Sequence, residues 1–235
     1  MKLTDLRGIL RYIPQFRDKT FIINVDGAIV TDENFTNLLV DIAVLRSLNI
    51  HVVLVHGASA QIRALARETG RAPSNLDGTG ITDEATLQLA LTAANRLTHE
   101  ILEGLAANDL RAACTNAVIA HPAGILHGVD QLFTGKVERV DTELLQRLLA
   151  QGIIPILPPL GFDGEGKTYR VNSDGVALAA AEALKAAKLM FITAHDGIRV
   201  GERIIRQMPL ADLESVLTLQ RQAIPPDLLS KAIHA

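Results

Sequence analysis

Aromatic side chains and cysteines are scarce in this chain of 235 residues: aromatics make up 3% of it, tryptophan is absent, and there is one cysteine, Cys114. A single cysteine excludes an intramolecular disulfide framework and a cysteine-based metal cluster, and we expect Cys114 to be a small buried residue. Because rings are few, the core has to be aliphatic, and a hydrophobic content of 48% is enough to build one.

An excess of basic charge is also missing. Lys and Arg total 23 against 26 Asp and Glu, a formal net charge of −3, so we expect no nucleic-acid partner. No apolar run approaches the roughly 20 residues of a membrane span, and the first residues, MKLTDLRGIL, do not form a signal peptide. The histidines lack metal-ligand spacing. The sequence therefore predicts a cytoplasmic protein with no membrane partner and no metal.

Short apolar runs alternate with longer amphipathic stretches, which is typical of an α/β fold with a mostly parallel sheet. Apolar residues recur at three- and four-residue spacings in 32–49, so this stretch is predicted to be a helix with one buried face. The other predicted helices are 60–68, 82–106, 142–152 and 171–188, and the predicted strands are 20–25, 50–57, 153–157 and 189–193.

Polar residues at the start of three of these helices are expected to cap them. Thr82 begins 82–106, Asp141 precedes 142–152, and Ser173 or Asp174 lies near the start of the last helix. Within 111–140, short β runs separated by Gly and Pro indicate hairpins beside the main sheet.

The domain organisation expected from the sequence is simple. No linker is evident, so residues 1–235 are expected to form a single domain with two unequal lobes. The N-lobe would take about 1–150 and the C-lobe about 151–235.

Three turns are candidates for binding a ligand at the sheet edge where strands end. Asp26-Gly27 and His56-Gly57-Ala58-Ser59 follow predicted strands, and their small residues would let a ligand approach backbone N–H groups. The third, Asn172-Ser173-Asp174, begins a helix. Each also has a structural explanation, because Gly permits a tight turn and Ser or Asp caps a helix. No phosphate-binding or dinucleotide-binding glycine motif is present.

Several segments together resemble the amino-acid kinase family, and within it the kinase-like domain of N-acetylglutamate synthases, with acetylglutamate kinases as near relatives. They are KTFIINVDG, DENFTNLLVDIAVLRSLNIHVVLVHGASAQI, ITDEATL, HGVDQLFTGKVERVDTELLQRLLAQG, DGEGKTYRVNSD and LMFIT, and the likeness runs from about residue 6 to about residue 193. The resemblance implies a three-layer α/β/α sandwich with a mostly parallel central sheet of about eight strands. It also implies an N-lobe for an acyl amino acid and a C-lobe for nucleotide.

The resemblance allows the kinase chemistry to be checked at each position. Asn24 stands where the family has the lysine that neutralises the transferred phosphoryl group, and Asp26 stands where a glycine approaches phosphate. Gly80 replaces the substrate-binding arginine. All three changes oppose phosphoryl transfer, so the resemblance implies a pseudokinase.

Other family positions are partly kept. Asn172 and the organising Asp174 are retained, whereas Arg170 replaces an asparagine and Thr193-Ala194 replaces a Ser-Asp pair. We therefore assign no confident catalytic residue and take Gly27, Gly57, Ala58, Ser59, Asn172 and Asp174 as candidate ligand-binding residues.

For the synthase branch, the resemblance implies a regulatory and oligomerising module that binds L-arginine. The whole synthase would catalyse the first step of arginine biosynthesis. The N-terminal helix would interlace between subunits, and Tyr12 on 5–16 is a candidate effector or interface residue. We expect an amino-acid ligand (arginine, glutamate or N-acetylglutamate) and a homo-oligomer. We further expect that the C-lobe is truncated and that no acetyltransferase domain is present.

Two alternatives remain open. The chain is an acetylglutamate kinase that uses ATP and Mg²⁺, with Lys167, Lys185 or Lys188 in place of the missing lysine, or it is a non-catalytic partner subunit. ATP and Mg²⁺ enter only if the first alternative holds; otherwise no cofactor is expected.

Overall fold

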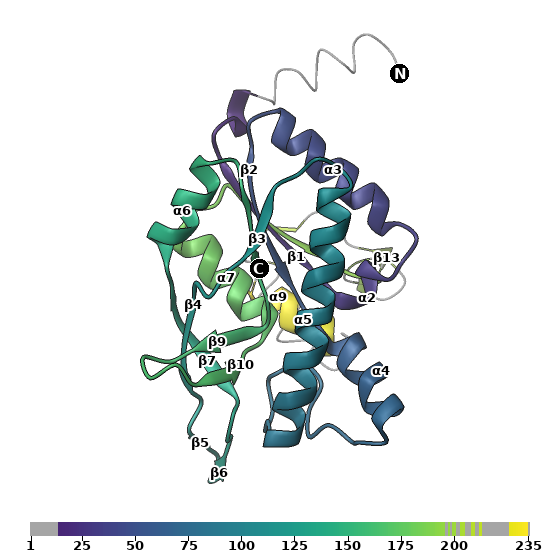
Figure 1. Cartoon of the computed structure of the whole chain (residues 1–235), viewed down its shortest axis with the longest axis vertical. Coiled ribbons are helices and arrows are strands. Elements are labelled where there is room, and N and C mark those ends of the chain that lie inside the picture. Colours follow the sequence, from purple (N-terminus) through teal and green to yellow (C-terminus); the bar gives the residue numbers. More distant parts are fainter. Residues whose placement is uncertain are drawn as a thin grey trace.

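The computed structural model describes residues 14–195, and beyond them 197, 199–200, 203–204, 208–209, 212 and 226–234 (Figure 1). A parallel sheet lies at its centre, with the strand order β11-β1-β2-β8-β3. Its strands are β1 (Thr20–Val25), β2 (His51–His56), β3 (Ala112–Cys114), β8 (Ile154–Leu157) and β11 (Lys188–Ile192). The predicted strands and their parallel pairing are confirmed.

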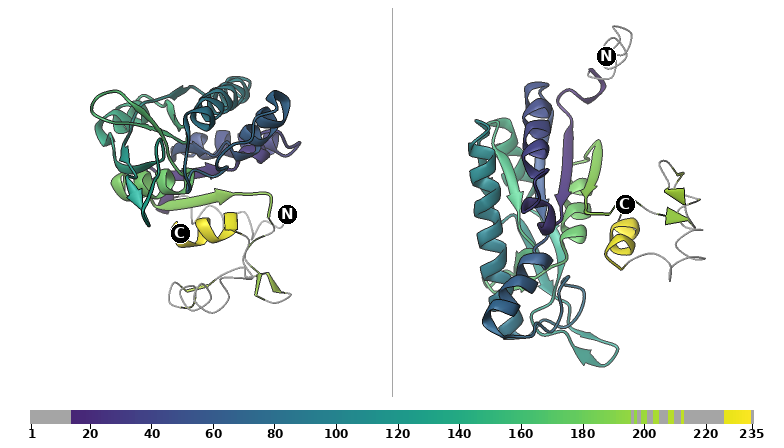
Figure 2. Two further views of the ribbon diagram at one scale, coloured as in Figure 1. Left: turned by 90° about the horizontal axis from the view of Figure 1, so that it is seen from below. Right: turned by 90° about the vertical axis from the view of Figure 1, so that its right-hand side faces the viewer.

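Helices cover both faces of this sheet (Figure 2). Strand side chains point alternately to the two faces. Ile23 and Leu54 pack into one core with α3 (Phe35–Ser47), α4 (Ser59–Thr69) and α5 (Glu84–Ala106). Ile22 and Val53 pack into the other with α6 (Thr142–Ala150) and α7 (Ser173–Ala183). These strands are almost wholly apolar because both faces are covered, and the result is the predicted three-layer sandwich.

A second, smaller sheet lies beside the first, with the order β10-β9-β4-β7. Within 111–140, β4 and β7 pair antiparallel and β5 and β6 form a projecting hairpin, as predicted. The strands are β4 (Val118–Pro122), β5 (Ile125–Leu126), β6 (Val129–Asp130), β7 (Gly135–Val140), β9 (Leu160–Phe162) and β10 (Thr168–Arg170).

The remaining elements are short. They are α2 (Gly27–Val30), β12 (Arg199–Val200), β13 (Arg203–Ile204) and α9 (Pro226–His234). In the part of the chain that the structure describes, no helix has both the length and the hydropathy that crossing a membrane requires.

Two of the three predicted helix caps are wrong. The α5 cap is Asp83, whose carboxylate accepts from the N–H of Thr86 at 2.7 Å. Thr82 is instead buried, and its hydroxyl meets that of Thr134 at 2.9 Å, so the helix begins one residue later. The α7 cap is Asn172, one residue before the predicted pair. Asp141 caps α6 as predicted.

The segment 111–114 also differs from expectation. The structure places β3 in the main parallel sheet beside β8 and not in a hairpin. With three residues, β3 is too short to give a recognisable alternation of apolar and polar side chains. Cys114 ends this edge strand and is exposed, so the prediction that it is buried is wrong.

Candidate functional site

The carboxyl ends of β1, β2 and β11 open onto a cavity of about 710 Å³. This is the sheet edge at which open α/β folds bind their ligands. The cavity is also walled by the loop 73–77, the first turns of α4 and α7, and α9, which lies beside β11 (Figure 2). Of the candidate ligand-binding residues, five line it: Gly27, Gly57, Ser59, Asn172 and Asp174.

The other candidate residues lie elsewhere. Ala58 is 2% exposed and belongs to the core behind the cavity wall. Asn24 is buried below the cavity at 1% exposure. Tyr12 lies outside the described residues.

Lys231 of α9 brings a cation to this sheet edge. Its Nζ lies 2.7 Å from Asp26 Oδ1 and 2.9 Å from Asp174 Oδ1, and its side chain is 9% exposed. Burial alone would lower the pKa of Lys231. The charges of Asp174 and Asp26 and their hydrogen bonds with the ammonium outweigh burial, so the pKa is raised above its ordinary value.

Asp174 organises this cluster. Its Oδ1 accepts from Asn24 Nδ2 at 2.7 Å as well as from Lys231, and its Oδ2 accepts from Ser230 Oγ at 2.6 Å. Asn24 Oδ1 is buried and has no hydrogen-bond partner among the described residues. Two carboxylates and one ammonium leave this cluster with a formal charge of −1.

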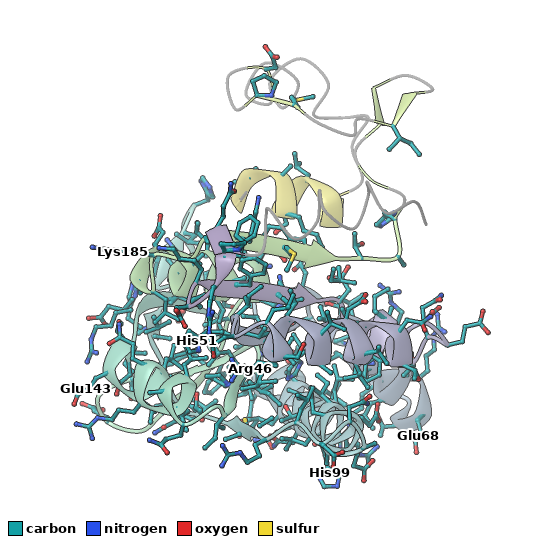
Figure 3. The ribbon with its side chains drawn as sticks, turned by 90° about the horizontal axis from the view of Figure 1, so that it is seen from above. Arg46, His51, Glu68, His99, Glu143 and Lys185 are labelled. Atoms are coloured by element: carbon teal, nitrogen blue, oxygen red, sulfur yellow. The ribbon has the colours of Figure 1, made fainter. Side chains whose placement is uncertain are left out.

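Lys231 was missed by the sequence argument, which named Lys167, Lys185 and Lys188 as substitutes. None of those three lines the cavity. Lys167 lies over the rings of Phe133 and Tyr169, and Lys185 lies at the outer edge of the molecule (Figure 3). The available signal was a lysine within the mostly apolar stretch 228–233, LLSKAI. A cation among buried side chains needs partners of opposite charge.

His56 at the end of β2 has a structural role. It is fully buried, and its Nε2 lies 2.9 Å from Thr98 Oγ1 on α5. The Thr98 hydroxyl donates its proton to Ala94 O, so His56 Nε2 is the donor in the contact with Thr98 Oγ1. Burial, opposed by the contact with Gly57 O, lowers the pKa of His56 to about 4.

A family model described as "Amino acid kinase family" matches residues 19–231, so the chain belongs to the amino acid kinase family. The amino-acid acetyltransferase of Vibrio cholerae is 34% identical over 227 residues, which cover 92% of this chain and 51% of that protein. The acetylglutamate kinase of Chlorobium chlorochromatii is 30% identical over 234 residues, which cover 96% of this chain and 80% of that protein.

Among solved structures, N-acetylglutamate synthase from Neisseria gonorrhoeae, complexed with coenzyme A and L-arginine, superposes with a TM-score of 0.90 at 26% identity. The likeness covers 100% of this chain and 57% of that one. This chain therefore spans about half the length of the acetyltransferases that it matches.

Proposed function

We propose that the chain is a kinase-like module of the N-acetylglutamate synthase type that does not transfer phosphate. In this proposal it is regulatory and self-associating, and its cavity binds a zwitterionic amino acid, with L-arginine as the leading candidate. The similarity to amino-acid acetyltransferases and to an arginine-bound synthase supports the proposal.

The observation that carries the proposal is the pairing of Lys231 with both Asp26 and Asp174. Phosphoryl transfer needs positive charge directed at the transferred group. Here the nearby cation is neutralised by two carboxylates, and Asn24 supplies no charge. An incoming phosphate would meet a cluster of formal charge −1, which repels it.

The same cluster favours the positive end of an amino acid. Asp26 is partly exposed and offers carboxylate oxygen to an ammonium or guanidinium group. Arg63 and the N-terminal turn of α4 line the cavity as well, and both favour a carboxylate. Opposite charges on one ligand would therefore meet opposite charges in the cavity.

A second candidate, an acetylglutamate kinase, is favoured by the presence of Lys231 beside Asp174 at the sheet edge. The similarity to an acetylglutamate kinase over 80% of that protein also supports it. This candidate needs Lys231 to leave Asp26 when Mg-ATP binds.

The test is an assay of N-acetylglutamate phosphorylation with Mg-ATP, together with calorimetry against arginine, glutamate, N-acetylglutamate and Mg-ATP. We expect no turnover and detectable binding of an amino acid. Turnover that disappears in Lys231→Met would establish the kinase and overturn our proposal. Tight binding of Mg-ATP without amino-acid binding would also contradict it, and no binding at all would favour a non-catalytic partner subunit.

A further inference from the structure

The loop 73–80, whose residues 73–77 form one wall of the cavity, is hydrogen-bonded to a buried arginine. Arg170 at the end of β10 is 2% exposed. Its Nη1 donates to Asn75 O at 2.9 Å and to Asn75 Oδ1 at 3.0 Å, and its Nη2 donates to Leu76 O. One guanidinium group therefore holds two consecutive residues that line the cavity.

Asn75 extends this attachment through the loop. Its Oδ1 accepts from the N–H of Gly78 at 2.8 Å, and its Nδ2 donates to Gly80 O and Thr82 Oγ1, each at 3.0 Å. At the other end of the wall, Asn172 Nδ2 donates to Asp77 O at 3.1 Å. The carbonyls of three successive residues, 75–77, are thus bonded to β10 or to the α7 cap.

Moving the loop away would break the hydrogen bonds that its oxygens accept from the buried guanidinium group of Arg170. The backbone of Arg170 is fixed in place, because its backbone N–H donates to Phe133 O and because β10 is paired with β9. Its guanidinium group donates to uncharged oxygens of the loop, namely the carbonyls of Asn75 and Leu76 and the side-chain Oδ1 of Asn75. Burial lowers the pKa of Arg170 to about 10, against the charge of Asp77, so the group is a cation at neutral pH. A buried cation without acceptors is strongly disfavoured.

This loop contributes to two cavities. A second cavity, of about 490 Å³, is lined by Gly78 and Thr79 of the loop and by Thr134, and Asn172 lines both cavities. Gly78 has a φ of +79°, and a Cβ there would lie 3.1 Å from Val171 O, so the loop packs closely on the chain behind it. Arg170 lines neither cavity and bonds to the loop that contributes to both.

We propose that Arg170 is a positioning residue that holds the loop 73–80 as a fixed wall of the amino-acid cavity, so that the wall is ordered before any ligand binds. A wall that is already ordered spares the ligand the cost of ordering it. Arg170 therefore affects ligand affinity without contacting the ligand. The identity of the ligand rests on the proposed function, whereas the attachment of the loop to Arg170 does not.

Hydrogen exchange and calorimetry test the proposal on the full chain. Arg170→Asn removes the cation, and Arg170→Lys keeps it but lacks the fork that reaches both carbonyls. The matched control is Arg46→Met, because Arg46 also donates to a backbone carbonyl, Ile50 O at 2.8 Å, but lies beside His51 at the other end of β2 (Figure 3). Thermal unfolding of all four proteins measures any general loss of stability.

We expect amides in 73–82 to exchange about 10- to 100-fold faster in both Arg170 variants than in the wild type or Arg46→Met. Arginine should bind the Arg170 variants about tenfold more weakly. It should also slow loop exchange in those variants much more than in the wild type, where the loop is already ordered.

Three results would overturn the proposal. If the amides of the loop exchange as fast in the wild type as in Arg170→Asn, then Arg170 does not hold the loop in place. Faster loop exchange with unchanged arginine affinity would rule out the positioning role. A wild type that binds no arginine would overturn both the proposed ligand and the effect of Arg170 on its affinity. The exchange comparison would still decide whether Arg170 holds the loop in place.

Discussion

At the scale of single residues, we expect Asp26 to decide which charge the cavity accepts. Replacing it with Gly or Asn removes one of the two carboxylates that neutralise Lys231. We expect Asp26→Gly and Asp26→Asn to raise the affinity for Mg-ATP and inorganic phosphate by about 1 kcal/mol, roughly fivefold, and to weaken arginine binding. Calorimetry with each ligand measures both changes.

Asp26→Asn is the sharper variant, because it removes the charge and keeps the shape of the side chain. Asp77, which also lines the cavity but is not bonded to Lys231, provides the control variant Asp77→Asn. If neither Asp26 substitution alters any affinity, Asp26 does not act on the ligand and its turn is purely structural.

His56 makes stability depend on pH. Its pKa is about 4 in the folded protein and near 6.5 when unfolded, because burial disfavours the charged ring. Between these values the unfolded chain binds more protons, so stability falls as the pH falls, by about 1.4 kcal/mol per pH unit. We expect His56→Gln to be less stable at neutral pH and to lose much of this slope.

Urea unfolding at about pH 7, pH 5.5 and pH 4.5 measures that slope. His99→Gln is the control, because His99 lies on the exposed face of α5, where its side chain is 73% exposed. An unchanged slope in His56→Gln would mean that His56 is not the group responsible.

Residue identities alone located the cavity better than they explained its charge. Glycine turns and the Asn172-Ser173-Asp174 motif were recognisable because local chemistry marks the ends of strands and the starts of helices. The ion pairs of Lys231 were not predictable in this way, since 57 residues separate Lys231 from Asp174 along the chain. The contacts of Arg170 with Asn75 span 95 residues, and no local pattern records them.

At the scale of elements, the sequence predicts long and apolar segments well and short ones poorly. Strands β1 and β2 lie inside their predicted ranges because both sheet faces are buried and every side chain is constrained. Strand β3 was missed because three residues carry no periodicity. Two caps were misplaced by one residue, since several adjacent residues have capping side chains and tertiary contacts select among them.

The cap of α5 is testable by mutation. Asp83 accepts from the N–H of Thr86, and burial is not needed for this bond. We expect Asp83→Ala to reduce the free energy of unfolding by about 1 kcal/mol, with a range of about 0.5–2 kcal/mol. Denaturant unfolding gives this value directly.

The control for that measurement is Glu100→Ala, on the exposed face of the same helix. It should change stability by less than about 0.5 kcal/mol. Equal effects of the two substitutions would show that the loss reflects charge or helix propensity and that Asp83 has no special role as a cap.

At the scale of the whole molecule, the site depends on segments from both ends of the family match. Asp26 follows the first strand, whereas Lys231 comes from α9, and Asp174 joins them. Removing α9 would leave two carboxylates and Asn24 without their cation. The charge of the cavity is thus a property of the folded chain as a whole and not of any one motif.

Self-association is expected to depend on the N-terminal stretch 5–16. Leu6, Ile9, Leu10 and Ile13 would share one helical stripe, with Tyr12 beside it. These residues lie outside the described ones, so the expectation rests on the sequence. An apolar stripe ahead of the first strand either packs on its own domain or joins two subunits, and we expect the second because the family resemblance implies an interlaced helix. Removing the stripe should then lower the mass of the assembly.

Light scattering of the full chain and of a chain that begins at Pro14 provides the measurement. A start at Pro14 keeps Phe16, whose ring packs edge-on against that of Phe21 of β1 with the ring centroids 5.4 Å apart. A full-length variant with Leu6 and Leu10 changed to Ser tests the same stripe without shortening the chain. We expect both altered proteins to keep the wild-type unfolding temperature and to form assemblies of fewer subunits than the full chain. Equal masses for all three proteins would show that the stripe does not join subunits.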